Sequence, residues 1–185
     1  MVGSADRAKR PAGLDRERVT SAAVRLLDAE GPAGFSMRRL AAELDVTAMS
    51  VYWYVDTKDE LLVLALDAVF GEVELPRTGS AAGWRDRLRG LATGYRAMLV
   101  RHPWVPALLG NQVEAGPCSG AFAACVRRVV ADAGIPASGQ VGAVSAVFRF
   151  VYGAHFAGAE PGERDSEFAL ELLIAGIEAV AARPG

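Results

Sequence analysis

Apolar residues recur three or four positions apart along most of this chain, which is the spacing of amphipathic α-helices. The first stripe consists of Val19, Ala22, Ala23, Leu26 and Leu27. Asp15 stands before this stripe as a helix N-cap, and Gly31-Pro32 stands after it as a stop signal. The pattern therefore predicts a first helix between these two signals.

Two shorter patterns follow, and each begins with a side chain that can cap a helix. Ser36 precedes an apolar spacing that ends at Leu44, and Thr47 precedes a second segment that extends to Tyr54. Asp45-Val46 interrupts the pattern between them. Two short helices joined by a tight turn make a helix-turn-helix, whose second helix can lie in the major groove of DNA.

Longer helical patterns occupy the rest of the chain, and beyond residue 83 no strand-like alternation of any length occurs. A helix over about 57–73 leads to a loop at 74–83, which contains Pro and Gly. Further helices are predicted over 84–100, 103–110, 117–133, 140–158 and 166–182. We therefore expect an all-α fold, in which a three-helix DNA-binding head is joined by a long helix to a helical C-terminal domain.

The predicted domains differ in their expected roles. Residues 1–14 form a flexible arm with basic residues at Arg7, Lys9 and Arg10, which is either a disordered tail or a segment that touches DNA beside the docked helix. We expect residues 15–58 to form the helix-turn-helix domain and residues 59–185 to form a second, helical domain.

The composition of the second short helix favours DNA binding. It carries three aromatic residues with polar tips, Tyr52, Trp53 and Tyr54, beside small residues that permit close approach. Arg38 and Arg39 stand at the start of the preceding helix, where the macrodipole disfavours cations, so a negatively charged partner is expected. The alternative is a pair of packed core helices with a solvated charged rim.

This stretch resembles the DNA-binding signature of the tetracycline-repressor (TetR) family of transcriptional regulators. The matching residues are Glu30-Gly31, Ser36-Met37-Arg38-Arg39-Leu40-Ala41, Val51-Tyr52-Trp53-Tyr54-Val55, Lys58 and Leu61-Leu62. Val51 replaces the usual Leu, and Tyr54 stands where His is common. The resemblance implies a homodimeric repressor that releases a palindromic DNA operator when a small effector binds.

The predicted DNA-contacting residues lie in and around the two short helices. They are Ser36, Arg38, Thr47, Ala48, Met49, Ser50, Tyr52, Trp53, Tyr54 and Lys58. Arg38 is the first candidate for reading a base, and guanine is the favoured partner of a bidentate arginine. Tyr52, Tyr54 and Lys58 are expected to grip phosphates.

The last two helices are predicted to form the dimer interface, because they carry apolar residues on more than one face together with small residues. The candidates are Val144, Val147, Val151, Phe168, Leu172, Leu173, Gly176, Ile177 and Val180. The alternative is a helical core formed entirely within one chain.

An effector pocket is predicted from aromatic, methionine and histidine residues of the C-terminal half. The candidate walls are Trp84, Tyr95, Met98, His102, Trp104, Phe122, Phe148, Tyr152, His155 and Phe156. Ordinary core packing is the alternative for each of them. The stretch 83–110 resembles the ligand domain of tetracycline-type members, but Leu91 and Leu109 stand where the tetracycline repressor has its drug-binding Asn and magnesium-binding His. The resemblance therefore implies a more apolar effector and no magnesium.

Composition narrows the remaining function classes. The 185 residues are half apolar with a net charge of −2, so DNA binding must depend on where the basic residues stand. Cys118 and Cys125 lie seven positions apart, about 10.5 Å along a helix, which is too far for a disulfide. The two His and two Cys have no zinc spacing, and we expect no metal or other cofactor.

The sequence also lacks the signals of the main rival classes. We find no signal peptide and no membrane-spanning run, so we expect a cytoplasmic protein. A phosphate loop, a nucleophile elbow and a Cys/His dyad are missing, so we do not expect an enzyme. A helical adaptor that binds protein through residues 47–54 remains the alternative function.

Overall fold

Helices make up the secondary structure of the residues that the computed structural model describes, which are 13–77, 82–109, 116–153 and 162–182. Their bounds are α1 Arg16–Gly34, α2 Met37–Glu43, α3 Ala48–Val51, α4 Lys58–Phe70, α5 Trp84–Arg101, α6 Val105–Leu109, α7 Pro117–Asp132, α8 Ala137–Gly153 and α9 Glu163–Ala181. The predicted all-α fold is confirmed. The predicted basic arm lies outside the described residues.

The helix starts in the N-terminal part follow from single capping side chains. Asp15 accepts a hydrogen bond from the backbone N–H of Arg18 at 2.7 Å, and Thr57 accepts one from Glu60 at 3.0 Å. Gly31 adopts φ 67° and kinks α1 at the predicted stop, a conformation that costs glycine little. The capping signals therefore marked these boundaries correctly.

Helix α3, the second helix of the predicted helix-turn-helix, is shorter than predicted. Helix α3 ends at Val51, and residues 52–54 continue as turns in which Tyr54 N–H donates to the Val51 carbonyl at 3.0 Å. The prediction of a helix to Tyr54 was wrong because tight i to i+3 bonds replace helical ones after Val51. The apolar residues beneath, Val51 and Val55, are buried in the head.

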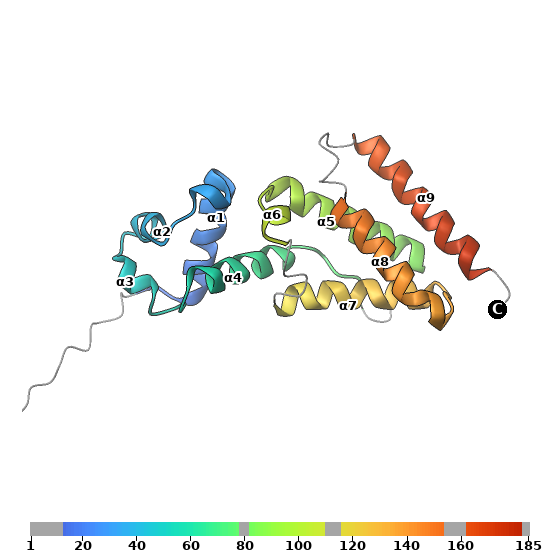
Figure 1. Cartoon of the computed structure of the whole chain (residues 1–185), viewed down its shortest axis with the longest axis horizontal. Coiled ribbons are helices and arrows are strands. Elements are labelled where there is room, and N and C mark those ends of the chain that lie inside the picture. The colour runs from blue at the N-terminus through green and yellow to red at the C-terminus, as the bar shows by residue number, and fades with distance from the viewer. Residues whose placement is uncertain (1–12, 78–81, 110–115, 154–161, 183–185) are drawn as a thin grey trace, which may run out of the picture.

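The molecule is elongated, with the head at one end and the body at the other (Figure 1). Helices α1, α2 and α3 form the head, and α4 runs from it to the body. Helix α4 packs on α1 at one end and on α7 at the other, so one core continues through both parts. Phe35 closes the head core, as expected, with 3% of its surface exposed.

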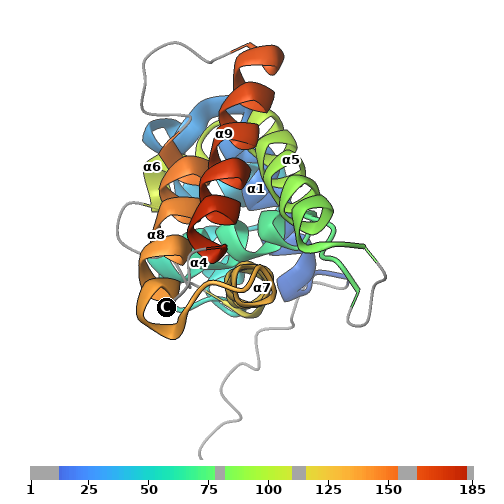
Figure 2. The same cartoon turned by 90° about the vertical axis from the view of Figure 1, so that its right-hand side faces the viewer.

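The body is completed by α5 to α9, with α8 and α9 side by side at the end away from the head (Figure 2). Arg89 on α5 donates to both carboxylate oxygens of Glu171 on α9, and these hydrogen bonds hold the pKa of Glu171 below its ordinary value. Helix α8 begins three residues before the predicted start, and the predicted end at residue 158 lies outside the described residues. Among the described helices, none is long and apolar enough to cross a membrane.

Candidate nucleic-acid interface and the junction behind it

An exposed apolar and aromatic surface surrounds α3. Met49 is 70% exposed, and Tyr52 and Trp53 are each 43% exposed. Large apolar side chains are costly to leave in water, so their grouping at one end of the molecule marks a contact surface. Thr47 stands at the edge of this surface, where its hydroxyl lies 3.0 Å from that of Ser50 and caps α3.

Arg38 and Arg39 have different surroundings although they are neighbours. Arg39 pairs with Glu30 and donates to the Gly34 carbonyl at 3.2 Å, so its charge is satisfied within the head. Arg38 is exposed. The expected need for an external anion therefore applies to Arg38 alone, while Ser36 serves as the N-cap of α2 by accepting from Arg39 N–H at 3.3 Å.

Three predicted DNA contacts have partners inside the head. The Lys58 ammonium donates to the Phe35 carbonyl at 3.1 Å and lies 5.5 Å from the centre of the Phe35 ring. The hydroxyl of Tyr54 is buried, and Ala48 is half-buried against the core. Lys58 is nevertheless exposed, and the phosphate-gripping roles of Lys58 and Tyr54 stay predictions. Contact with DNA likewise stays a prediction for the other members of the set, which are Ser36, Arg38, Thr47, Ala48, Met49, Ser50, Tyr52 and Trp53.

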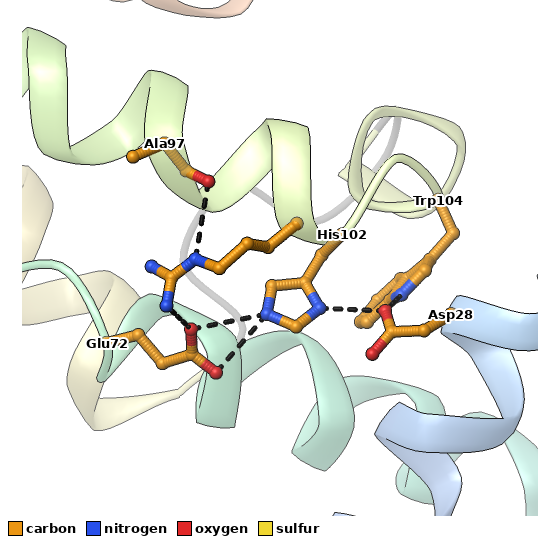
Figure 3. A network of polar contacts seen from close by, with 6 residues as sticks. Asp28, Glu72, Ala97, His102 and Trp104 are labelled. Carbon is orange, nitrogen blue, oxygen red and sulfur yellow. Dashed lines mark hydrogen bonds and ion pairs between the residues drawn. The ribbon is translucent and has the colours of Figure 1, made fainter.

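A polar network joins the head to the body, and Figure 3 shows its members. His102, the C-cap of α5, places Nδ1 2.7 Å from Asp28 Oδ1 and Nε2 3.2 Å from both carboxylate oxygens of Glu72. Trp104 Nε1 donates to the same Asp28 oxygen at 2.6 Å. The two ring nitrogens face different carboxylates, so this is a hydrogen-bonded bridge, and the described residues contain no group suited to a metal ion.

Several of the predicted pocket residues make other contacts in the described part of the chain. His102 and Trp104 belong to the polar network, and their role as pocket walls stays a prediction. Tyr95 and Phe122 pack with Phe70 in an aromatic cluster, with ring centres 5.6–5.9 Å apart.

The other predicted pocket residues are dispersed. Met98 is fully buried, Trp84 lies under the Arg85 guanidinium at 4.9 Å, and Phe148 is half-buried. The side chain of Tyr152 and residues 154–161, which include His155 and Phe156, lie outside the described residues. A surface depression of about 420 Å³ lies beside Glu74, Pro76 and Arg87, and none of the ten predicted residues lines it.

The buried carboxylate of Asp67, which sequence reasoning missed, links α4 to α7 by hydrogen bonds. Asp67 Oδ1 accepts hydrogen bonds from the backbone N–H and the hydroxyl of Ser119, at 2.9 and 3.1 Å, and Oδ2 accepts from Cys118 N–H at 3.3 Å. A side chain at position 116 would collide with Asp67, so Gly116 allows this close approach. Burial and the neighbouring Asp67 carboxylate raise the pKa of the Cys118 thiol.

The predicted dimer residues divide into buried and exposed groups. Val147, Val151 and Ile177 are buried within the chain, which corrects their assignment to an interface, and Val144 and Leu173 are half-buried. The exposed members are Phe168, Leu172, Gly176 and Val180. Val141, which is 80% exposed, extends their surface onto α8. Sequence reasoning missed Val141 although it lies within the predicted helix 140–158, because the pattern did not show which side of that helix is exposed.

Two family models match the chain. The model of bacterial regulatory proteins of the tetR family matches residues 19–65, and the model of the tetracyclin repressor-like C-terminal domain matches residues 75–166. The first range contains the helix-turn-helix, and the second covers most of the body. The matches therefore follow both parts of the fold.

Relatives and solved structures agree with these matches. An HTH-type transcriptional regulator of Saccharopolyspora erythraea is 43% identical over 141 residues, which are 76% of this chain and 59% of the relative. The HTH-type transcriptional repressor DrrR1 of Streptomyces coeruleorubidus is 38% identical over 141 residues, which are 76% of this chain and 52% of that protein. The chain thus spans between half and three fifths of the length of these curated relatives. The crystal structure of the Streptomyces coelicolor TetR family protein ActR in complex with actinorhodin matches with a TM-score of 0.81 at 25% identity, covering 93% of this chain and 99% of that one.

Proposed function

This chain belongs to the tetR family of bacterial regulatory proteins, and we propose that it is a DNA-binding transcriptional repressor controlled by a small effector. The observation that carries the proposal is the exposed surface of Met49, Tyr52 and Trp53 on a helix-turn-helix. The curated relatives are named as a regulator and a repressor of transcription, which supports this role over that of an enzyme. Such a protein acts where the chromosome lies, in the cytoplasm.

On the DNA side, the surface around α3 enters the major groove. Arg38 reads a base edge, while Met49 and Trp53 supply apolar contacts to bases and sugars. The Tyr52 hydroxyl binds a phosphate. The head is residues 15–58, and residues 59–185 bind effector and form the dimer.

The active species is a homodimer formed through α8 and α9. Exposed Phe168 and Leu172 on α9, with Val141 on α8, provide an apolar face that a second copy would cover. Exposed Gly176 in the middle of α9 lets helices approach closely. Two heads held by this interface read two half-sites about 34–36 Å apart.

The effector is a small and mainly apolar molecule that binds within the body without magnesium. ActR, which shares this fold, is described in complex with actinorhodin, so a body of this architecture can hold an organic ligand. Leu91 and Leu109 are buried here and offer no ligand to a metal ion. Effector binding lowers DNA affinity by favouring a different arrangement of the heads, to the extent that the effector prefers that arrangement.

Selection of bound duplexes from a random DNA pool by the purified protein tests this function. We expect a palindromic consensus with half-sites about one helical turn apart, and an affinity that falls steeply as salt rises. The selected operator then serves as the probe for effectors that release it. If the folded protein enriches no sequence at low salt, the proposal is wrong, and protein binding through the α3 surface becomes the better account.

A further inference from the structure

Three segments that belong to different parts of the molecule meet at one buried histidine. Asp28 lies on α1 in the head, Glu72 follows the end of α4, and His102 joins α5 to α6 in the body (Figure 3). His102 is only 6% exposed. The ring therefore lies where the helices of the body meet α1 of the head.

The ring is a rigid bridge between the two carboxylates. Its nitrogens point in opposite directions, toward Asp28 at 2.7 Å and Glu72 at 3.2 Å, so one planar group fixes the distance between α1 and the end of α4. Each ring nitrogen lies within hydrogen-bond distance of one carboxylate, and Arg101 pairs with Glu72 at 2.8 Å as a second partner of that side chain. The His102 ring is buried while the two carboxylates are partly exposed, so the ring itself is the part of the bridge that water reaches least.

The ring is also fixed to the body. The backbone N–H of His102 donates to the Met98 carbonyl at 2.8 Å, and its carbonyl accepts from Val105 N–H at 3.1 Å. The first bond ties it to α5 and the second ties it to α6. A shift of α5 against α6 must therefore turn or displace the imidazole.

We propose that His102 is the positioning residue through which the body sets the orientation of the DNA-binding head. The Asp28–His102–Glu72 bridge holds α1 and the end of α4 in one arrangement, and Trp104 donates a second hydrogen bond to the Asp28 oxygen that His102 contacts. When the junction of α5 and α6 moves, the bridge breaks and the head turns on the body. The consequence for operator binding rests on the function proposed above, but the mechanical role of the bridge does not.

The orientation of the head can be measured without DNA. Spin labels attached to two cysteines at exposed positions report the distance between head and body. The cysteines are introduced by Glu17→Cys on α1 and Ala131→Cys on α7. Cys118→Ser and Cys125→Ala remove the native thiols, and an excess of unlabelled protein restricts the signal to pairs within one chain. Pulsed electron resonance then gives the distribution of this distance.

Asp28→Ala and His102→Gln break the bridge from its two sides. We expect each to broaden the distance distribution about two-fold or more, and the double variant to add nothing further, because one bridge is lost in all three. Arg101→Gln is the matched control, since it removes a partner of Glu72 without touching Asp28, and it should leave the distribution narrow. Asp28 is partly exposed on a helix, so its alanine variant folds even where the His102 variant does not.

Operator binding provides the second readout. We expect the parent to lose about ten-fold in affinity when two base pairs are inserted between the half-sites, because rigid heads must then deform the DNA. The Asp28→Ala variant should lose less than about three-fold while keeping the same half-site consensus. If both bridge variants keep the parent's distance distribution, His102 has no positioning role. If the parent selects no palindrome, the proposed function fails instead, and the distance measurement still decides the role of His102.

Discussion

At the scale of single residues, Arg38 differs from its neighbour in having its charge exposed at the first turn of α2. The positive end of the helix macrodipole disfavours a cation there. Arg39 offsets this cost by pairing with Glu30 in the same head. For Arg38, a hydrogen-bond acceptor outside the protein would offset the same electrostatic cost. We therefore assign the contact with a DNA base to this arginine.

Replacing Arg38 with Ala should therefore reduce affinity for the preferred operator by about 1–3 kcal/mol and relax the base preference at one position of each half-site. Repeating the selection from random DNA with the variant measures both effects. Arg39→Ala is the matched control and should keep every base preference. An Arg38 variant with the parent's consensus and affinity would show that another residue reads the base.

The Cys118 thiol should react slowly at neutral pH, because burial and the Asp67 carboxylate both raise its pKa. The raised pKa keeps the thiol protonated, and only the thiolate is a good nucleophile. The rate of alkylation by iodoacetamide, followed by mass spectrometry as a function of pH, should rise at a higher pH than for a free cysteine peptide. Removing the neighbouring charge with Asp67→Asn should move this rise to lower pH, and an unmoved profile would assign the shift to burial alone.

Sequence reasoning could not predict contacts between residues that lie far apart in the chain. Lys58 binds the Phe35 carbonyl 23 positions away, and His102 binds Asp28 74 positions away. Neither pairing leaves a periodic signal, because it depends on how helices are arranged in space. The exposed positions Met49, Tyr52 and Trp53 lie on the predicted motif because a local pattern defines that motif.

At the scale of elements, α4 packs against both the head and the body. Its first turn is capped by Thr57, and its second half presents Asp67 to the start of α7. A carboxylate is stable in this buried position because the free N–H groups and the macrodipole of α7 face it. Asp67 thus acts as an N-terminal cap supplied by another helix.

Asp67→Ala should lower the free energy of unfolding by about 1–3 kcal/mol, because the N–H groups of Cys118 and Ser119 lose their acceptor. Urea denaturation followed by circular dichroism measures the change. Asp59→Ala, on the exposed first turn of the same helix, is the control and should cost about 0.3–1 kcal/mol or less. If both variants lost the same free energy of unfolding, the cap on α7 would contribute no more stability than an exposed charge does.

Helix starts that carry a capping side chain were predicted correctly. Asp15, Ser36 and Thr47 each cap the helix that the sequence assigned to them, because a cap is a contact between residues three positions apart. The end of α3 was not predictable, since residues 52–54 keep a helix-like composition while their hydrogen bonds tighten into turns. Composition does not distinguish these two bonding patterns.

At the scale of the whole molecule, the head and the α8/α9 face lie at opposite ends (Figure 1). The periodicity of the sequence predicted which helices are apolar all round. It could not predict which side of each helix is covered by the chain itself, so Val147 and Ile177 were wrongly assigned to the interface. The covered side depends on the packing of α5 and α7 beneath, which no local pattern records.

The exposed side of α9 yields a test of the assembly. Leu172 is 59% exposed beside Phe168, so an arginine there meets water in the single chain and an apolar surface in the dimer. Leu172→Arg should therefore leave the unfolding of the single chain within about 0.5 kcal/mol of the parent while shifting the protein toward monomer. Sedimentation velocity over a range of concentrations measures this shift.

Val100→Arg provides the comparison, because Val100 is 63% exposed on α5 and lies outside the α8/α9 face. The same change in charge and size should leave the dimer intact there. Loss of the dimer should also weaken operator binding, since two linked heads bind more tightly than one at the same protein concentration. If the Leu172 variant remains dimeric, the interface lies elsewhere. If the variant is monomeric but binds a full palindrome as tightly as the parent, DNA recognition does not depend on dimer formation.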